Sequence, residues 1–129
     1  MNSRETRLAP PLPSWTLVTS HGLALLYIAT HPQATGREIA SALEVTERRV
    51  ADLVRDLAEA DYIVVTRQGR RNVYSINPES RFRHPLVADI PFGAFIRLWR
   101  LTHLNDGDAR ASAAYSLGIE DLRPPEPAK

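Results

Sequence analysis

The sequence predicts a domain of the mainly α class with a small β-hairpin (α+β) and an extra C-terminal helix. Three patterns predict this class. Residues 35–60 contain two amphipathic segments with helical spacing, residues 62–76 contain two strand-like segments around an Arg-rich turn, and residues 91–99 carry a further apolar stripe. The length of 129 residues is enough for one domain of ordinary size.

The first helix of residues 35–60 begins with a recognisable cap. Thr35 is a good N-cap residue, and Glu38 three positions later completes a Thr-x-x-Glu capping box. An apolar stripe follows at helical spacing, formed by Ile39, Ala40 and Leu43. Glu44 then occupies a turn position that often holds Gly, which predicts a left-handed backbone conformation at this residue.

A second, longer helix is expected from Thr46, its N-cap, to residue 60. On a helical wheel its inward face is formed by Val50, Leu53, Val54 and Leu57. The opposite face carries Arg48, Asp52, Arg55 and Glu59, with Arg49 and Asp56 on its flank. Two capped helices joined by a tight turn form a helix-turn-helix pattern, whose second helix can lie in a DNA major groove.

A β-hairpin with a basic tip is expected next. Tyr62–Thr66 is rich in β-branched and aromatic residues, and Asn72–Ile76 alternates in character, as expected of two strands. Between them, residues 67–71 form an Arg-rich turn around Gly69. Helices followed by such a hairpin are typical of a winged helix-turn-helix, which is therefore the predicted fold.

Three motifs follow one another in this part of the chain: TGREIA, LEVTERRVADLVRDLAEADYI and RQGRRNVYSI. Together they resemble the winged helix-turn-helix transcriptional regulators of the MarR and ArsR type. The GRRNVY hairpin and the RHPL segment at residues 83–86 are similar to a group of small bacterial winged-helix proteins of about this length. The resemblance covers residues 15 to about 90, and it implies DNA binding by a homodimer.

The chain divides into four expected parts. Residues 1–13 contain three Pro and no apolar periodicity, which indicates a flexible N-terminal arm. Residues 14–78 form the winged helix-turn-helix domain, residues 79–104 a connector with the C-terminal helix, and residues 105–129 a weakly structured tail. The domain opens with a first helix, capped by Thr19 or Ser20, that presents Leu23, Leu26 and Tyr27 on one face and ends before Pro32.

The C-terminal helix is expected to start with Pro91 at its first position. Its apolar stripe is formed by Phe92, Phe95, Ile96 and Trp99. A small winged helix has little core left for four such residues, so we expect part of the stripe, together with Trp15, to form a homodimer contact. The alternative is that the stripe simply folds back on the first helix.

Positive charge is concentrated at the hairpin, although the net charge of the chain is only +1. Residues 35–66 carry four Arg against seven acidic residues, a balance of −3, whereas residues 67–84 carry five Arg against one Glu, a balance of +4. Fifteen of the sixteen basic residues are Arg, the residue that makes bidentate contacts with phosphate and guanine.

Two sets of candidate DNA contacts follow. The set on the third helix is Thr46, Arg48, Arg49, Asp52 and Arg55. The set on the second helix and the wing is Thr35, Arg37, Arg67, Arg70, Arg71 and Asn72. Arg48 and Arg49 are placed to read bases and Arg55 to bind a phosphate. The alternative for the third helix is a solvated surface with an Arg48–Asp52 ion pair, and for the wing an ordinary polar turn.

Other function classes find little support. The chain has no Cys, no His pair with zinc-ligand spacing, no Gly-rich phosphate loop and no Ser-His-Asp arrangement, so we expect no enzyme activity, metal or cofactor. His21 is expected to make a structural hydrogen bond. The longest apolar run is too short to span a bilayer and the N-terminal segment lacks a signal-peptide core, so a cytoplasmic location is expected.

The sequence therefore predicts a regulator of transcription that binds specific double-stranded DNA as a homodimer. The helix at residues 46–60 would enter the major groove, and the wing at residues 67–72 would contact the backbone or the minor groove. The balance of −3 over residues 35–66 favours an alternative, a winged helix used as a protein–protein interaction module. A small apolar effector between the first and C-terminal helices is compatible with either.

Overall fold

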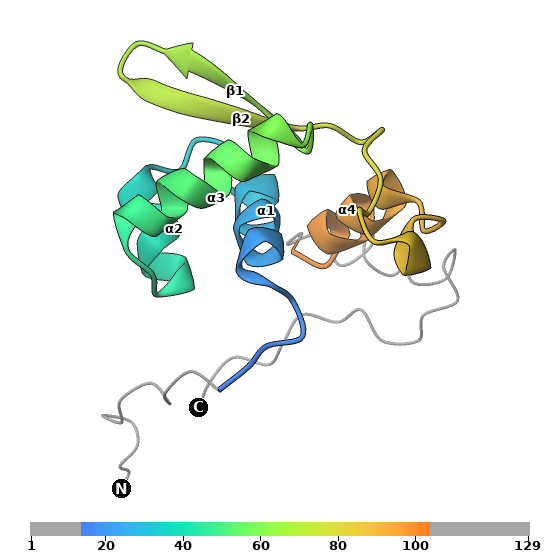
Figure 1. Ribbon diagram of the computed structural model, residues 1–129. Helices are drawn as coiled ribbons and strands as arrows, with labels where there is room; N and C mark the ends of the chain where they lie inside the picture. The colour runs from blue at the N-terminus through green and yellow to red at the C-terminus, as the bar shows by residue number, and fades with distance from the viewer. Residues whose placement is uncertain (1–13, 104–129) are drawn as a thin grey trace, which may run out of the picture.

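The structure, a computed structural model, describes residues 14–103 and is a winged helix-turn-helix with an additional helix (Figure 1). The arm expected at residues 1–13 and the tail expected at residues 105–129 lie outside the described residues. The elements in chain order are α1 (Ser20–Thr30), α2 (Gly36–Leu43), α3 (Glu47–Glu59), β1 (Ile63–Gln68), β2 (Arg71–Ile76), the 3-10 turn η1 (Pro85–Val87) and α4 (Phe92–Leu101). The predicted fold class is confirmed.

Helix α1 lies at the centre of the fold. Thr19 caps it as expected, because its side chain accepts a hydrogen bond from the Gly22 amide. Of the face expected from Leu23, Leu26 and Tyr27, Leu26 is buried and Tyr27 packs against the core, but α1 buries more residues than that face. Helices α2, α3 and α4 and strand β2 all pack against α1, so its buried residues surround most of its circumference: Ala24, Leu25, Leu26, Ile28 and Ala29.

The helix-turn-helix forms as its capping residues predict. The Thr35 hydroxyl accepts from the Glu38 amide at 3.1 Å, and the Glu38 carboxylate accepts from the Thr35 amide at 2.8 Å. Thr46 caps α3 by accepting from the Arg49 amide at 3.0 Å. Between the helices Glu44 adopts the left-handed conformation, with φ of 58°, as expected.

Replacing Glu44 by glycine is expected to stabilise the fold by about 0.5–1 kcal/mol, because the left-handed conformation is costly for a residue with a β-carbon. The measurement is the free energy of unfolding from urea denaturation. Glu44→Ala removes the same charge but keeps the β-carbon, so it is the matched control. Equal stabilisation by alanine would mean that charge, and not backbone conformation, limits stability at this position.

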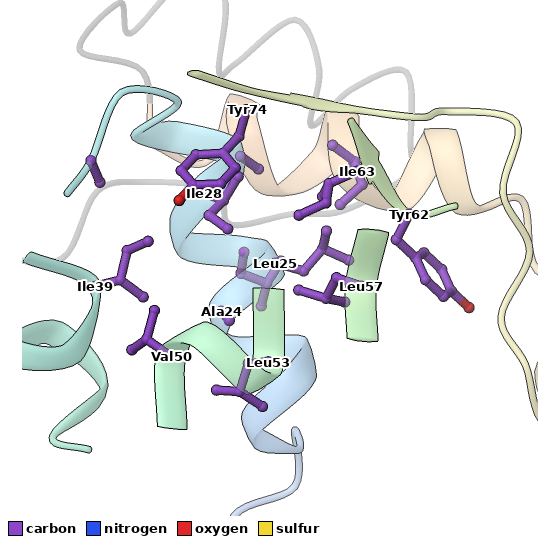
Figure 2. Packing of buried hydrophobic residues seen from close by; sticks show 14 of the residues in the cluster. Ala24, Leu25, Ile28, Ile39, Val50, Leu53, Leu57, Tyr62, Ile63 and Tyr74 are labelled. Atoms are coloured by element: carbon purple, nitrogen blue, oxygen red, sulfur yellow. The ribbon is translucent and has the colours of Figure 1, made fainter. Parts of the chain in front are cut away.

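The core lies between α1, the helix-turn-helix pair and the base of the hairpin (Figure 2). Four of its side chains have less than 2% of their surface exposed: Ile28, Ile39, Leu53 and Ile63. From the predicted inward face of α3, Val50, Leu53 and Leu57 are buried, and Val54 is half-buried at its edge. The inward face of α3 is therefore the one that the sequence predicted.

The hairpin is tighter than expected. Its strands pair in antiparallel register from Ile63 opposite Ile76 to Gln68 opposite Arg71, so the turn contains only Gly69 and Arg70. Gly69 has a φ of 63°, and a glycine with positive φ at the first position of a two-residue loop matches the twist of the strands. The Tyr74 amide donates to the Pro32 carbonyl at 2.8 Å, which anchors the hairpin to the loop before α2.

Helix α4 begins at Phe92. Pro91, predicted to be the first residue of this helix, is its N-cap and so lies one position before the helix. Phe92 and Ile96 are buried in the core of their own chain. The Trp99 indole donates to the Leu26 carbonyl at 2.8 Å, which holds α4 against α1. Phe92 and Ile96 thus follow the alternative, in which the stripe folds back on the first helix, whereas the half-buried Trp99 remains a predicted dimer residue.

Two residues of the expected dimer contact stay accessible. Trp15 is 74% exposed, and Phe95 is 36% exposed at the edge of α4. Leu17 and Leu86 are the most exposed large apolar side chains of residues 14–103, at 91% and 85%. Within the same residues, no helix has the length and apolar character needed to cross a membrane.

Candidate nucleic-acid interface

The opening turn of α3 presents two Arg side chains to solvent. Arg48 and Arg49 are both exposed, and Arg48 forms no ion pair with any residue in the described part of the chain. The alternative Arg48–Asp52 pair does not form, because Asp52 forms its ion pair with the Arg55 guanidinium instead, at 3.2 Å. Arg48 therefore keeps its full donor capacity at the end of the helix that reaches bases in helix-turn-helix docking.

Arg55, further along α3, lies between two carboxylates. Its Nη1 atom is 3.2 Å from Asp52 Oδ1, and its Nε atom is 3.9 Å from Asp56 Oδ1. The side chain is 59% exposed, so it faces solvent on the predicted outward face. Its charge is nevertheless balanced within the helix, which reduces what it contributes to binding a phosphate.

The other oxygen of Asp56 is bonded to α1. His21 Nε2 lies 2.8 Å from Asp56 Oδ2, which confirms the expected structural hydrogen bond of His21. This hydrogen bond lowers the pKa of Asp56 below its usual range. Because the folded-state pKa is lowered, the contact stabilises the fold at neutral pH, and that contribution is lost as the pH falls through the pKa of Asp56.

The start of α2 is polar and partly neutralised. Arg37 Nε lies 3.6 Å from the Glu47 carboxylate at the first turn of α3, with side chains that are 87% and 61% exposed. Thr35 and Thr46 accept amides within their own helices, but their hydroxyl protons are free to donate to a phosphate oxygen. The Thr35 amide lowers the pKa of Glu38, which keeps the capping box charged.

The wing residues divide into different roles, which sequence alone did not separate. Arg70 lies at the tip, is exposed and has no hydrogen-bond or ion-pair partner among residues 14–103. Arg67 Nε donates to the Gly69 carbonyl at 3.3 Å, within the turn. Arg71 Nη1 donates to the Gln33 carbonyl at 2.9 Å, so this side chain ties the wing to the loop before α2. Of the three wing Arg residues, Arg70 is therefore the one whose guanidinium donors are not used within residues 14–103.

A groove runs between the start of α2, the side of α3 that carries Ala51, Val54 and Ala58, and the wing. Glu47 and Arg55 border it from α3, and Asn72 and Val65 line it from the wing. Figure 1 shows the hairpin beside α3, in agreement with the contacts between α3 and β1. The structure therefore brings both predicted sets of DNA contacts to neighbouring elements, with Arg71 as a structural tie and Asn72 half-buried in the groove.

The chain is similar in fold to MepR. MepR is a transcription regulator of the Staphylococcus aureus multidrug efflux pump MepA, and it matches with 17% sequence identity and a TM-score of 0.45 over 80% of this chain and 78% of its own. At this identity the likeness concerns the fold alone. No protein-family profile and no curated protein sequence matches the chain.

A second hollow lies where the sequence placed an apolar effector. A groove of about 520 Å³ runs between the start of α1, the connector after the hairpin and α4. Its apolar lining includes Leu17, Val18, Leu25, Leu57, Phe82 and Phe95. The described residues contain no group of three or more His, Asp and Glu side chains that could hold a metal ion.

Sequence reasoning missed the contacts between elements. The His21–Asp56 pair joins residues 35 positions apart, and the Arg37–Glu47 pair crosses the turn between α2 and α3. The helical periodicity of a sequence shows which residues share a face, but it does not show which residues of two different helices pair with each other. The excess of acids over Arg in residues 35–66 was the available signal, because it implied that some of the Arg side chains are neutralised.

Proposed function

We propose that the protein regulates transcription by binding specific double-stranded DNA as a homodimer. Helix α3 enters the major groove, where Arg48 and Arg49 contact base edges. The wing contacts the backbone or the minor groove through Arg67 and Arg70. The observation that carries this proposal is the pair of exposed Arg side chains, Arg48 and Arg70, on two elements that border one groove and without ion pairs within residues 14–103.

Acidic side chains on α3 limit the non-specific attraction of this helix to DNA. Besides its Arg residues, α3 carries four acidic side chains: Glu47, Asp52, Asp56 and Glu59. These carboxylates repel phosphates and neutralise Arg37 and Arg55. Binding then depends on a few phosphate contacts and on correct base contacts, which favours discrimination over general affinity.

Exposed apolar side chains support a second copy as a partner. They lie before α1 and between the hairpin and the middle of α4: Trp15, Leu17, Leu86, Ile90 and Phe95. Their burial between two chains would complete the homodimer, with Trp15 and Phe95 retained from the predicted contact. Two-fold symmetry then requires a pseudo-palindromic site with half-sites about one helical turn apart.

The second candidate function is a protein–protein interaction module. The charge balance of −3 over residues 35–66 and the same exposed apolar side chains favour it. In that case a partner protein, and not DNA, covers α3 or the apolar residues. The two functions differ in a simple measurement, since an interaction module has negligible affinity for any duplex at physiological salt.

Replacing Arg70 by alanine is expected to weaken binding to every duplex alike and to reduce the slope of log affinity against log salt by about 1, because one phosphate contact is lost. Fluorescence anisotropy on a specific and a scrambled duplex at several salt concentrations measures both effects. Arg97→Ala is the matched control, since Arg97 is an exposed Arg on α4, away from the groove. Equal losses in the two variants would contradict the role of the wing.

A further inference from the structure

The outer half of the wing, residues 66–71, is not held by the core. Every residue of this half is exposed, whereas the buried side chains of the hairpin, Ile63 and Tyr74, lie nearer its base. A two-stranded hairpin alone is only marginally stable in water. The orientation of the outer half therefore depends on polar contacts with other segments of the chain.

Two successive carbonyls of the loop before α2 hold strand β2. The Tyr74 amide donates to the Pro32 carbonyl at 2.8 Å, and Arg71 Nη1 donates to the Gln33 carbonyl at 2.9 Å. The first bond holds the middle of β2, and the second holds its first residue, next to the turn. Among the hydrogen bonds and ion pairs of residues 14–103, the Arg71–Gln33 bond is the one that joins the outer half to a segment outside the hairpin.

The short turn connects this bond directly to Arg70. Only Gly69 and Arg70 lie between the paired residues Gln68 and Arg71, so no flexible segment separates Arg70 from Arg71. The Arg70 side chain is exposed and has no hydrogen-bond or ion-pair partner within residues 14–103. The direction in which Arg70 points is therefore set by the backbone of the turn, which Arg71 holds.

We propose that Arg71 is a positioning residue for DNA binding, which through its bond to Gln33 fixes the wing against the helix-turn-helix pair and directs Arg70 toward the DNA. This inference rests on the proposed function, because the direction of Arg70 matters only if the wing contacts DNA. A hairpin that is already fixed in the free protein loses less conformational entropy when it binds. Arg71 thus raises the affinity without contacting the DNA itself.

The expected size of the effect follows from the bond that is lost. Removing it weakens binding by at most the free energy that the bond contributes, and a single hydrogen bond changes an equilibrium constant by about two- to tenfold. Arg71→Ala is therefore expected to weaken binding to the specific duplex by about this factor for each subunit of the proposed homodimer. Circular dichroism and urea denaturation establish that the variant is folded.

The test is a double-mutant cycle between Arg70 and Arg71. Fluorescence anisotropy gives the dissociation constant of the best-binding duplex for the natural chain, Arg70→Ala, Arg71→Ala and the double variant. If Arg71 acts by directing Arg70, Arg71→Ala has little effect in a chain that already lacks the Arg70 guanidinium. Losses that simply multiply would show that Arg71 contacts the DNA independently, and they would overturn the proposal. An Arg71→Ala variant that binds as tightly as the natural chain would overturn it as well.

Arg97→Ala is the matched control, because Arg97 is an exposed Arg on α4. It should change neither the affinity of the natural chain nor the loss caused by Arg70→Ala.

A second measurement, on the free protein, separates this inference from the proposed function. In Arg71→Ala, the NMR order parameters of the Gly69 and Arg70 amides are expected to fall from about 0.85, the value of a rigid backbone, to about 0.6 or below. Arg97→Ala should leave them unchanged. If they fall in a protein that binds no DNA, the proposed function fails and Arg71 serves only to hold the wing. If DNA binds but the order parameters stay high in Arg71→Ala, the inference is overturned and the proposed function stands.

Discussion

Replacing Phe92 by alanine is expected to lower the free energy of unfolding by about 3–5 kcal/mol, which is typical for a buried phenylalanine. The ring is only 2% exposed. It packs edge-on against Tyr62, with ring centroids 5.2 Å apart, and against Phe82 at 5.5 Å. Urea denaturation, followed at a protein concentration where the chain is monomeric, measures the loss.

The matched control is Phe95→Ala on the same helix. Phe95 is 36% exposed and packs on Phe82 at 5.6 Å, so its truncation should cost roughly 1 kcal/mol or less in the monomer. If Phe95 contributes to the homodimer, its loss should instead weaken self-association. Equal destabilisation by the two variants would contradict the division of α4 into a buried and an accessible side.

Replacing Arg48 by alanine is expected to remove about 1–3 kcal/mol of discrimination between the specific duplex and a scrambled one, because a base contact is lost. Binding to scrambled DNA should change little. Arg48 is given this role because it is exposed at the opening turn of α3 and has no ion pair in the described part of the chain. Competition titrations with both duplexes measure the effect.

Arg55→Ala provides the comparison on the same face of α3. Asp52 and Asp56 already engage its guanidinium, so we expect a smaller loss that is the same for both duplexes. A loss of discrimination in Arg55→Ala as large as that in Arg48→Ala would contradict the assignment of the two residues. It would mean that Arg55 leaves its carboxylates and reads a base.

The helix-turn-helix could be predicted almost completely, because its signals are local. Thr35, Glu38 and Thr46 act within three residues of their own positions, and the apolar residues of α3 recur at the helical period. Glu44 was assigned its left-handed conformation from its place in the turn alone. The capping box of α2, the Thr46 cap of α3 and the turn between the two helices all predicted the same arrangement.

The packing of α1 and α4 could not be predicted from periodicity. Helix α1 is apolar around most of its circumference, so no single face could be chosen until its neighbours were known. The stripe of α4 looked too large for a small core, but the uncovered side of α1 receives Phe92, Ile96 and Trp99. These contacts join residues some seventy positions apart, as the Trp99–Leu26 hydrogen bond illustrates.

The sequence predicted which residues form the candidate site, but it did not predict which of them pair with other residues of the chain and which stay unpaired. Sequence spacing placed Arg48, Arg55 and Arg70 on exposed positions, which the structure shows. The Arg48–Asp52 ion pair, weighed as the alternative, does not form. Asp52 pairs with Arg55 instead, because an acid that lies three or four residues from two Arg side chains can pair with either, and side-chain geometry decides which. Arg71 was grouped with the other wing residues, although it bonds the Gln33 carbonyl.

The central claim, sequence-specific DNA binding by a homodimer, is tested most directly by selecting bound fragments from genomic DNA with the full-length protein. The best fragment is then titrated against a scrambled duplex at two salt concentrations. We predict a shared inverted repeat with half-sites about one helical turn apart, and a preference that survives the higher salt. Weak binding to every fragment, without a common sequence and lost at the higher salt, would contradict the claim.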